Sequence, residues 1–351
     1  MVVVQIQRRA GLAQHSVESY FGRVRSALGE EITASLAVAP HFSRGFIRRL
    51  LNLFWALQFR HCLTHVTGDV QYLVLPLCRR RCVLTVLDCE ILERLKGLRR
   101  WLVKLLWFRF PVSRAAVITV ISEETKRQLL RHVCVSSERV VVVPVSVSEN
   151  LRFKPAVFRA NCPVVLQVGV KHNKNLPRLI EALAGIPCLL RIVGTADVKL
   201  RQILEQSGIR FEVLGRLSEA ELAAAYEECD VVAFCSTHEG FGMPIVEAQR
   251  VGRVCVTANC SSMPEVSGGA ACLVDPFSVE SIRDGFRRVI RDEEYRNSLI
   301  SSGRRNAERF NAEQIAALFA RIYSLVDECS SLRVSDQDWE AAVRARCRLL
   351  S

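Results

Sequence analysis

Residues 236–247 read Ser-Thr-His-Glu-Gly-Phe-Gly-Met-Pro-Ile-Val-Glu, and they follow the apolar run Val231-Val-Ala-Phe-Cys235. An apolar run of this length is typical of a buried parallel strand. Gly240 and Gly242 predict a tight loop after the strand, and Pro244 is suited to the first turn of a helix. A strand, a glycine loop and a helix N-terminus in this order offer backbone N–H groups and a positive dipole end to an anion.

Two carboxylates lie within this stretch, Glu239 in the loop and Glu247 in the first turns of the helix. A carboxylate beside an anion site is suited to accept hydrogen bonds from hydroxyl groups, such as those of a ribose or a sugar. The stretch therefore predicts a nucleotide-sugar site. The simpler alternatives are a solvated loop carboxylate at Glu239 and an ordinary first-turn helix acid at Glu247.

Length and composition predict a well-packed protein of two domains: the chain has 351 residues, of which 50% are apolar and 24% charged. No segment reaches the roughly 20 consecutive apolar residues that span a bilayer. The first residues do not have the pattern of a secretion signal, so we expect a cytoplasmic protein. The 14 cysteines are scattered through apolar runs. With no export signal, we expect them to be reduced, mostly buried thiols. Zinc ligation is disfavoured because the spacing of structural zinc sites is absent.

Basic charge is concentrated in the first half. Residues 1–155 carry 24 Lys and Arg against 11 Asp and Glu, whereas residues 156–351 carry 24 against 25. Segments 44–60 and 94–114 contain no acid and hold three of the four tryptophans. Basic side chains opposite an apolar, Trp-containing stripe favour a helix lying in an anionic membrane interface. The alternative is that the stripe packs on its own sheet; nucleic acid is disfavoured because no reading motif is present.

Strands and helices alternate through both halves, which predicts two parallel α/β domains. We expect an N-terminal domain over residues 1–150, a second domain over 151–312, and C-terminal helices over 313–351 that cross back to the first. Ligands of open α/β sheets bind at the carboxyl ends of the strands. In the first half we expect His65–Asp69 to form a turn, residues 72–75 to form a short strand, and residues 82–87 to form a strand ending at Asp88.

Four motifs of the second half together resemble the retaining glycosyltransferases of family 4, which have the GT-B fold. They are Val168–Leu176 (VGVKHNKNL), Leu214–Leu222 (LGRLSEAEL), the stretch 236–247, and Leu273–Phe277 (LVDPF). The resemblance implies two Rossmann-like βα domains that face each other across a cleft. It also implies transfer of a hexose from a nucleoside-diphosphate sugar to a glycan or lipid-linked acceptor in surface polysaccharide biosynthesis, with no cofactor and no metal.

The resemblance also assigns residues. The catalytic group would be Glu239, Lys174 and Asp88. Lys174 would neutralise the diphosphate leaving group, Glu239 would hold hydroxyls of the donor sugar, and Glu247 would bind the ribose. The donor-binding residues would be Gly169, Lys171, Lys174, Gly194, Leu214, Gly215, Arg216, Glu239, Gly240, Phe241, Gly242 and Glu247. The acceptor-side residues would be Gly11, Ser16, His65, Asp69 and Asp88.

The sequence departs from the family pattern at two positions. Val170 stands where many members have a basic residue, and whether the next residue, Lys171, substitutes for it is open at this point. Leu87 stands where members often have a histidine. Either the alignment shifts at this point, or His65 or Asp88 does that work, or transfer is impaired. Two alternatives stay open at this point. One is a non-catalytic GT-B subunit that binds nucleotide and scaffolds a membrane glycan-assembly complex, and the other is a nucleotide-sugar epimerase of similar fold.

Overall fold

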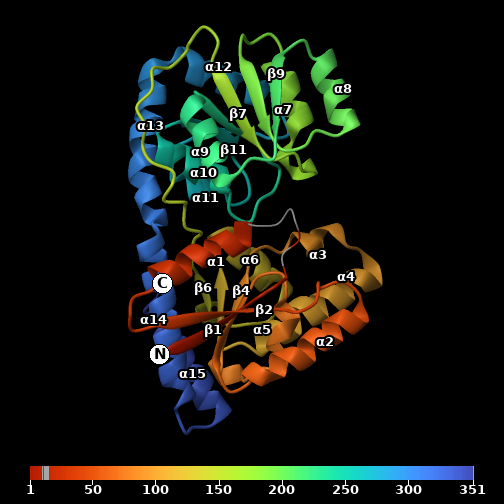
Figure 1. The fold of residues 1–351 in the computed structure, drawn as a ribbon, viewed down its shortest axis with the longest axis vertical. Coiled ribbons are helices and arrows are strands. Elements are labelled where there is room, and N and C mark those ends of the chain that lie inside the picture. Colours follow the sequence, from red (N-terminus) through yellow and green to blue (C-terminus); the bar gives the residue numbers. More distant parts are fainter. Residues whose placement is uncertain (10, 12–15, 351) are drawn as a thin grey trace. The chain divides into compact units, whose positions relative to one another are not determined.

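The computed structural model describes residues 1–9, 11 and 16–350, which form two compact units (Figure 1). Unit 1 consists of Met1–Ser146 together with the segment from Ala312 onward, and unit 2 consists of Val147–Asn311. Each unit contains a six-stranded sheet in which every strand pair is parallel. The predicted α/β class with two Rossmann-like domains is confirmed.

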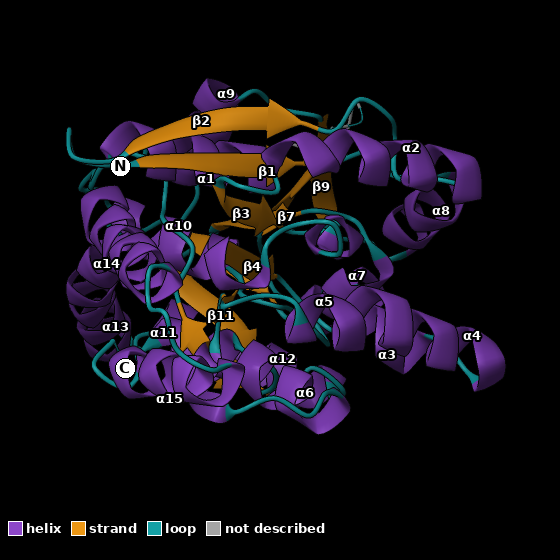
Figure 2. Ribbon diagram, turned by 90° about the horizontal axis from the view of Figure 1, so that it is seen from below, coloured by secondary structure: helices purple, strands orange, loops and turns teal. Residues whose placement is uncertain are grey.

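The sheet of unit 1 has the order β2-β1-β3-β4-β5-β6. Its strands are β1 (Val2–Gln7), β2 (Thr33–Val38), β3 (Leu63–Thr67), β4 (Cys82–Val86), β5 (Val117–Val120) and β6 (Val140–Val142). Its helices are α1 (Ser16–Ala27), α2 (Phe46–Ala56), α3 (Glu90–Arg94), α4 (Gly97–Val103), α5 (Phe110–Ser113), α6 (Glu123–His132), α14 (Ala312–Ser330) and α15 (Asp336–Cys347). In both ribbon views α2, α4 and α5 gather at one side of the unit, and α14 and α15 lie at the other (Figures 1 and 2).

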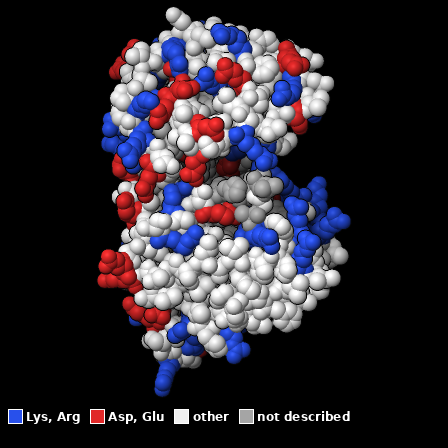
Figure 3. All heavy atoms as spheres, in the orientation of Figure 1, with Lys and Arg blue, Asp and Glu red and all other residues white. Residues whose placement is uncertain are grey.

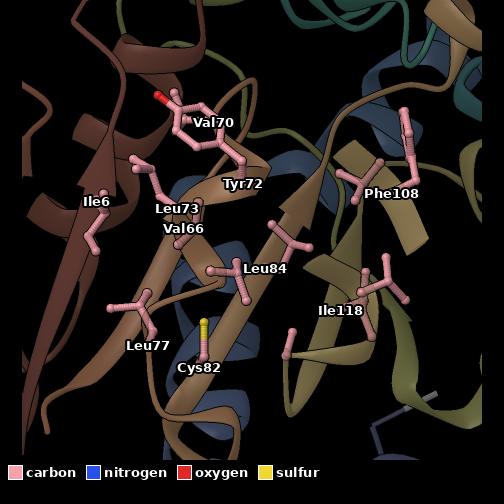
Figure 4. Packing of buried hydrophobic residues seen from close by; sticks show 14 of the residues in the cluster. Ile6, Val66, Val70, Tyr72, Leu73, Leu77, Cys82, Leu84, Phe108 and Ile118 are labelled. Carbon is pink, nitrogen blue, oxygen red and sulfur yellow. The ribbon is translucent and has the colours of Figure 1, made fainter. Parts of the chain in front are cut away.

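One buried cluster of unit 1 lies between one face of this sheet and the helices that follow β2 and β4, and a second covers the opposite face, where α1 and α14 pack. Alternate strand residues point into the first cluster, because successive side chains of a strand face opposite sides. Figure 4 shows Ile6, Val66, Leu84 and Ile118 from four neighbouring strands, packed with Phe108 and others. The five side chains named here are each at most 1% exposed.

The sheet of unit 2 has the order β12-β11-β10-β7-β8-β9. Its strands are β7 (Val164–Val168), β8 (Leu189–Val193), β9 (Arg210–Gly215), β10 (Val231–Phe234), β11 (Val254–Ala258) and β12 (Cys272–Val274). Its helices are α7 (Leu176–Leu183), α8 (Val198–Gln206), α9 (Glu219–Glu228), α10 (Met243–Val251), α11 (Met263–Ser267), α12 (Val279–Arg291) and α13 (Glu293–Ala307). The chain runs outward from β7 to β9, returns to β10 beside β7, and continues to β12. This is the Rossmann strand order, whose reversal falls between β7 and β10.

Two local predictions in unit 1 are wrong. Residues 63–67 form β3, so His65 lies in a strand and not in a turn. β3 contains three polar residues that are buried like the apolar ones, so the segment lacks the apolar run by which a buried strand is recognised. Residues Gln71–Val74 form a 3-10 turn in place of the expected short strand. Segment 94–114 is not one continuous α-helix, because α4 is followed by a π-helical stretch at Lys104–Arg109.

Candidate functional site

The glycine loop of the opening motif lies at the strand-order reversal of unit 2. β10 pairs with β7, and both strands end at the same edge of the sheet. The loop after β7 and the loop after β10 therefore come together, and Thr237 N donates to Asn173 O over 2.8 Å. Open α/β sheets bind ligands at this point, because the connecting helices diverge to opposite faces and leave the strand ends open.

The loop after β7 is shaped by two residues in left-handed backbone conformation. Gly169 has a φ of 89°, and Asn175, directly before α7, has a φ of 60°. Asparagine tolerates this conformation better than most residues. The Asn175 amide also donates to Cys235 O over 3.1 Å and to Pro276 O over 2.6 Å, which ties the loop to its neighbours. Between these two residues, Lys174 completes a short 3-10 turn.

Two serines that follow β11 fix the loop after β10. Ser261 Oγ accepts from Glu239 N at 3.2 Å and donates to Glu239 O at 2.6 Å. Ser262 Oγ donates to Phe241 O at 2.7 Å. Helix α10 then begins after Gly242, whose φ of 108° favours glycine. These bonds fix the Glu239 backbone, so the position from which its carboxylate extends is set by the two serines.

Lys174 and Glu239 form an ion pair between the two loops. Lys174 Nζ lies 2.7 Å from Glu239 Oε1, and the two side chains are 14% and 16% exposed. The Lys174 ammonium also stands 4.3 Å from the centre of the Phe234 ring. Asn173 Nδ2 donates to the same Glu239 oxygen over 3.0 Å. The pair places a cation and a multiple hydrogen-bond acceptor side by side at the carboxyl edge of the sheet.

Glu247 is positioned by a tyrosine that the sequence did not indicate. Tyr226, at the end of α9, donates from its hydroxyl to Glu247 Oε2 over 2.5 Å. Burial and the nearby Glu247 carboxylate raise the pKa of Tyr226 well above its usual range. The phenol therefore keeps its proton and continues to donate at alkaline pH. Glu247 also makes further contacts within the protein.

Three of the predicted glycines lie side by side at the ends of β7, β8 and β9. Gly169 N donates to Val193 O over 2.8 Å, and Gly194 N donates to Gly215 O over 2.7 Å. A Cβ at Gly194 would meet Val170 Cγ1 at 3.0 Å, so Val170 covers this glycine. The other donor-side predictions fall around this edge as well: Lys171 and Arg216 are exposed, Leu214 is half-buried, and Phe241 packs its ring against Phe310.

His65 lies in the core of unit 1, which corrects its assignment to the acceptor side. It is fully buried, with Nδ1 2.7 Å from Tyr323 Oη and Nε2 2.7 Å from Thr85 Oγ1. Burial lowers its pKa to about 3, so the ring is neutral. Both nitrogens are occupied, and the residue is a structural histidine.

Three other residues predicted for the acceptor side, Gly11, Asp69 and Asp88, line one cavity of about 790 Å³ in unit 1. Asp69 is ion-paired with Arg8, and Asp88 accepts from Glu90 N over 3.1 Å. Helix α1 begins at Ser16, the fifth residue of this group, whose side chain lies outside the described part of the structure. The sequence did not indicate the arginines that share this cavity.

The residues that sequence reasoning missed in unit 2 are Asn173, Tyr226, Ser261 and Ser262. Asn173 is part of the recognised motif beside Lys174, and both serines follow a strand adjacent to β10. The rule that functional residues follow parallel strands would have found the serines once the strand order was known. Tyr226 lies on a helix and carries no such signal.

The fold is shared with the GT-B glycosyltransferases. HepE from Anabaena, whose structure is in complex with UDP-glucose, superposes with a TM-score of 0.74 at 18% identity, over 92% of this chain and 99% of HepE. Such a low identity shows the fold alone.

Residues 149–306, which lie within unit 2, match the family model "Glycosyl transferases group 1". The serotype-specific mannosyltransferase WbdA of Escherichia coli is 24% identical over 230 residues, covering 59% of this chain and 28% of WbdA. The O-antigen chain mannosyltransferase B of Escherichia coli is 25% identical over 241 residues, covering 61% and 62%. The matches thus span between about a quarter and two thirds of these relatives. The chain thus carries, within unit 2, a region that matches the group 1 glycosyltransferases.

Proposed function

We propose that this protein is a retaining hexosyltransferase that uses a nucleoside-diphosphate sugar and glycosylates a hydroxyl of a glycan or lipid-linked acceptor in surface polysaccharide biosynthesis. The observation that carries this proposal is the Lys174–Glu239 ion pair at the strand-order reversal of unit 2. It combines a cation suited to a diphosphate with a carboxylate suited to sugar hydroxyls. The mannosyltransferase relatives and the UDP-glucose bound by HepE support the same class of donor.

The ion pair keeps both charges partnered when no donor is bound. Two largely buried charges are costly unless they are paired, and here each satisfies the other. A bound donor replaces both halves of the pair: diphosphate oxygens take the place of the carboxylate at Lys174, and sugar hydroxyls donate to Glu239. Glu247, oriented by Tyr226, accepts from the ribose hydroxyls. The donor therefore exchanges polar contacts without leaving a buried charge unpaired.

In the proposed reaction, the bond between the anomeric carbon and the diphosphate oxygen breaks as the acceptor oxygen attacks from the same face. The acceptor proton passes to the departing diphosphate oxygen, so configuration is retained and a nucleoside diphosphate is released. The Lys174 ammonium stabilises negative charge that grows on the diphosphate as the bond breaks. The N-terminus of α10 adds backbone N–H groups and a positive dipole end.

The reaction is proposed to need no metal, because Lys174 and the α10 N-terminus supply the positive charge. Activity is expected to be unchanged after treatment with EDTA. A loss of activity that Mg²⁺ or Mn²⁺ restores would overturn this part of the proposal.

Glu239→Gln is the decisive variant for the proposed reaction. Release of nucleoside diphosphate is measured for a panel of UDP-, GDP-, ADP- and dTDP-sugars, without acceptor and with lipid-linked glycan extracts. We expect Glu239→Gln to reduce release from the preferred donor by about 100-fold or more, as removal of a transition-state contact does. Glu280→Gln, which changes an exposed carboxylate of α12, serves as the matched control.

Unchanged release in Glu239→Gln would overturn the assignment of this carboxylate. Nucleotide-sugar binding without turnover for any acceptor would instead indicate a scaffold subunit. Conversion of the donor to an isomer without release of nucleotide would indicate an epimerase, which chromatography of the donor alone separates.

We place the protein in the cytoplasm, in peripheral contact with the inner face of the cell membrane through unit 1. The supporting observation is the exposure of large apolar side chains on α2 and α4: Phe46 is 79% exposed, Ile47 72%, Leu98 71% and Trp101 57%. Figure 3 shows a wide surface without charge over the region of α2, with basic side chains at its margin. Each Lys or Arg near an anionic leaflet contributes about 1 kcal/mol. None of the described helices is long and apolar enough to span a bilayer.

Sedimentation with phosphatidylglycerol-containing vesicles tests this contact. We expect pelleting that falls with added salt and that is reduced in the double variant Ile47→Ser/Trp101→Ser. Val198→Ser removes an equally exposed apolar side chain from unit 2 and is expected to pellet like the unmodified protein. Equal pelleting of all three proteins, or equal pelleting with phosphatidylcholine alone, would contradict the contact.

A further inference from the structure

The cavity of unit 1 lies at the carboxyl edge of its parallel sheet. Arg8 and Arg9 follow β1, Asp69 follows β3, and Asp88 follows β4. The segment after β2, including the start of α2, closes another side. Four neighbouring strands thus direct their following residues into one space of about 790 Å³. Both its position and its size are those of a small-molecule site in an α/β domain.

The lining of this cavity is strongly basic. Five arginines, Arg8, Arg9, Arg44, Arg48 and Arg49, face two aspartates, Asp69 and Asp88. Arg8 is ion-paired with Asp69 and with Glu18, so the Asp69 charge is already used. Within the described part of the chain, neither Arg44 nor Arg48 forms an ion pair. Charges of one sign in a concave, low-dielectric wall focus the potential and attract an anion.

Arg49 is held in place by contacts that do not neutralise it. Its guanidinium lies over the Trp107 ring, 4.4 Å from the ring centre, and Nη2 donates to Ser43 O over 3.2 Å. Its Nε–H is buried and meets no acceptor among the described residues. A guanidinium stacked on an aromatic ring is pre-organised, so it loses little freedom when it binds an oxyanion.

A buried amide in the same wall also lacks a partner. Gln71, which lines the cavity, is 5% exposed, and its Oε1 accepts no hydrogen bond from any described residue. A buried polar atom without a partner is costly, and an unfilled acceptor fits a hydroxyl donor. The cavity therefore offers arginine donors for an oxyanion and an acceptor for a hydroxyl group.

We propose that this cavity binds the acceptor of the transfer reaction through a phosphate group, so that the acceptor is a phosphate-bearing sugar or polyol. Arg44, Arg48 and Arg49 bind the phosphate, and Gln71 receives a hydroxyl of the same molecule. Arginine forks match the tetrahedral oxygens of phosphate and bind them bidentately. The assignment of this ligand as the acceptor rests on the proposed function, whereas binding of the phosphate by the cavity does not.

Calorimetric titration of the full chain with α-glucose 1-phosphate, and separately with glucose, tests the cavity. We expect the sugar phosphate to bind, and the variant Arg44→Gln/Arg48→Gln to weaken its affinity by about tenfold or more, since it removes charge-assisted hydrogen bonds to the phosphate. The control Arg131→Gln/Arg333→Gln removes two exposed arginines of unit 1 outside the cavity and is expected to bind normally. Gln71→Leu is expected to weaken binding of the sugar phosphate as well.

A lipid source of the same phosphate is tested with phosphatidylcholine vesicles with and without phosphatidic acid. Binding that requires phosphatidic acid and falls in Arg44→Gln/Arg48→Gln, without binding of the free sugar phosphate, would assign a lipid-linked phosphate. If neither probe is affected by this variant, if the control loses as much affinity, or if glucose binds as well as its phosphate, the proposal is overturned.

Two further measurements distinguish binding at this cavity from binding at the donor site of unit 2. Glu239→Gln is expected to bind the probe normally, and Arg44→Gln/Arg48→Gln is expected to bind UDP normally. A protein that releases no nucleoside diphosphate but loses the probe in the arginine variant would refute the proposed function while supporting the phosphate site. If the protein releases nucleoside diphosphate, but Arg44→Gln/Arg48→Gln binds the probe as well as the control Arg131→Gln/Arg333→Gln, the proposed function is supported and the phosphate site is refuted.

Discussion

The backbone of Gly169 lies directly against the aliphatic part of Lys174, so that a Cβ at position 169 would stand 3.2 Å from Lys174 Cε. The glycine thus has two functions. It adopts a φ of 89°, which L-residues rarely adopt, and it leaves the space through which the lysine reaches Glu239. The absence of a side chain at Gly169 therefore affects both the conformation of the loop after β7 and the position of the Lys174 ammonium.

We expect Gly169→Ala to lower the free energy of unfolding by about 1–2 kcal/mol through backbone strain and also to weaken nucleotide binding, because Lys174 must move. Gly208→Ala is the matched control: its φ is 70°, but no atom lies within 4 Å of the added Cβ. It is expected to lose similar stability and to bind normally. Thermal unfolding and calorimetry with UDP measure the two effects. Equal binding by both variants would show that Lys174 does not depend on the space at Gly169.

The Lys174–Glu239 pair should show strong coupling in stability. Lys174→Met and Glu239→Gln each leave one largely buried charge without its partner, so each is expected to lose about 1–3 kcal/mol. The double variant removes both charges and is expected to lose less than the sum of the two. Urea unfolding followed by circular dichroism measures the cycle. Additive losses would mean that the ion pair contributes little to the resting state.

Removal of the Tyr226 hydroxyl should affect binding more than chemistry. Tyr226→Phe retains the buried ring but deletes the 2.5 Å hydrogen bond to Glu247. We expect affinity for the nucleotide to fall about five- to tenfold, since a hydrogen bond to a charged group contributes about 1.5–3 kcal/mol and Glu247 keeps other contacts. KM for the donor should rise while kcat changes little. Tyr295→Phe, at the start of α13, is the control. A fall in kcat alone would argue against a binding role for Glu247.

Much of unit 2 could be predicted from its sequence, because its strands are apolar and its loops carry glycines. The apolar run that begins at Val231 forms β10 as expected, and the two loops that hold Lys174 and Glu239 were recognised from their motifs. The contact of these loops depends on the neighbouring positions of β7 and β10, which lie far apart in the chain. Only the strand order shows it.

Unit 1 was less predictable because its decisive contacts are long-range and polar. The partner of His65 Nδ1 is Tyr323, 258 residues away, so local sequence could not distinguish a core histidine from an exposed one. The arginines of segment 44–60 were interpreted as a membrane-facing series. Arg44, just before α2, and Arg48 and Arg49 on α2 line the cavity, whereas Phe46 and Ile47 of α2 are exposed outside its lining. One amphipathic pattern thus provides two different surfaces.

Burial of His65 should make unit 1 sensitive to mild acid. Its pKa is lowered from 6.5 to about 3, so the unfolded state binds a proton more readily than the folded state. The stabilisation is fully present above pH 6.5 and is lost as the pH falls toward 3. Between pH 7 and pH 5 the expected loss is about 2 kcal/mol.

All four tryptophans lie in unit 1, so urea unfolding at both pH values can be followed by their fluorescence. His65→Gln should abolish this part of the pH dependence, whereas His61→Gln, which changes an exposed histidine, should retain it. The same loss in both variants would mean that other groups cause the sensitivity to acid.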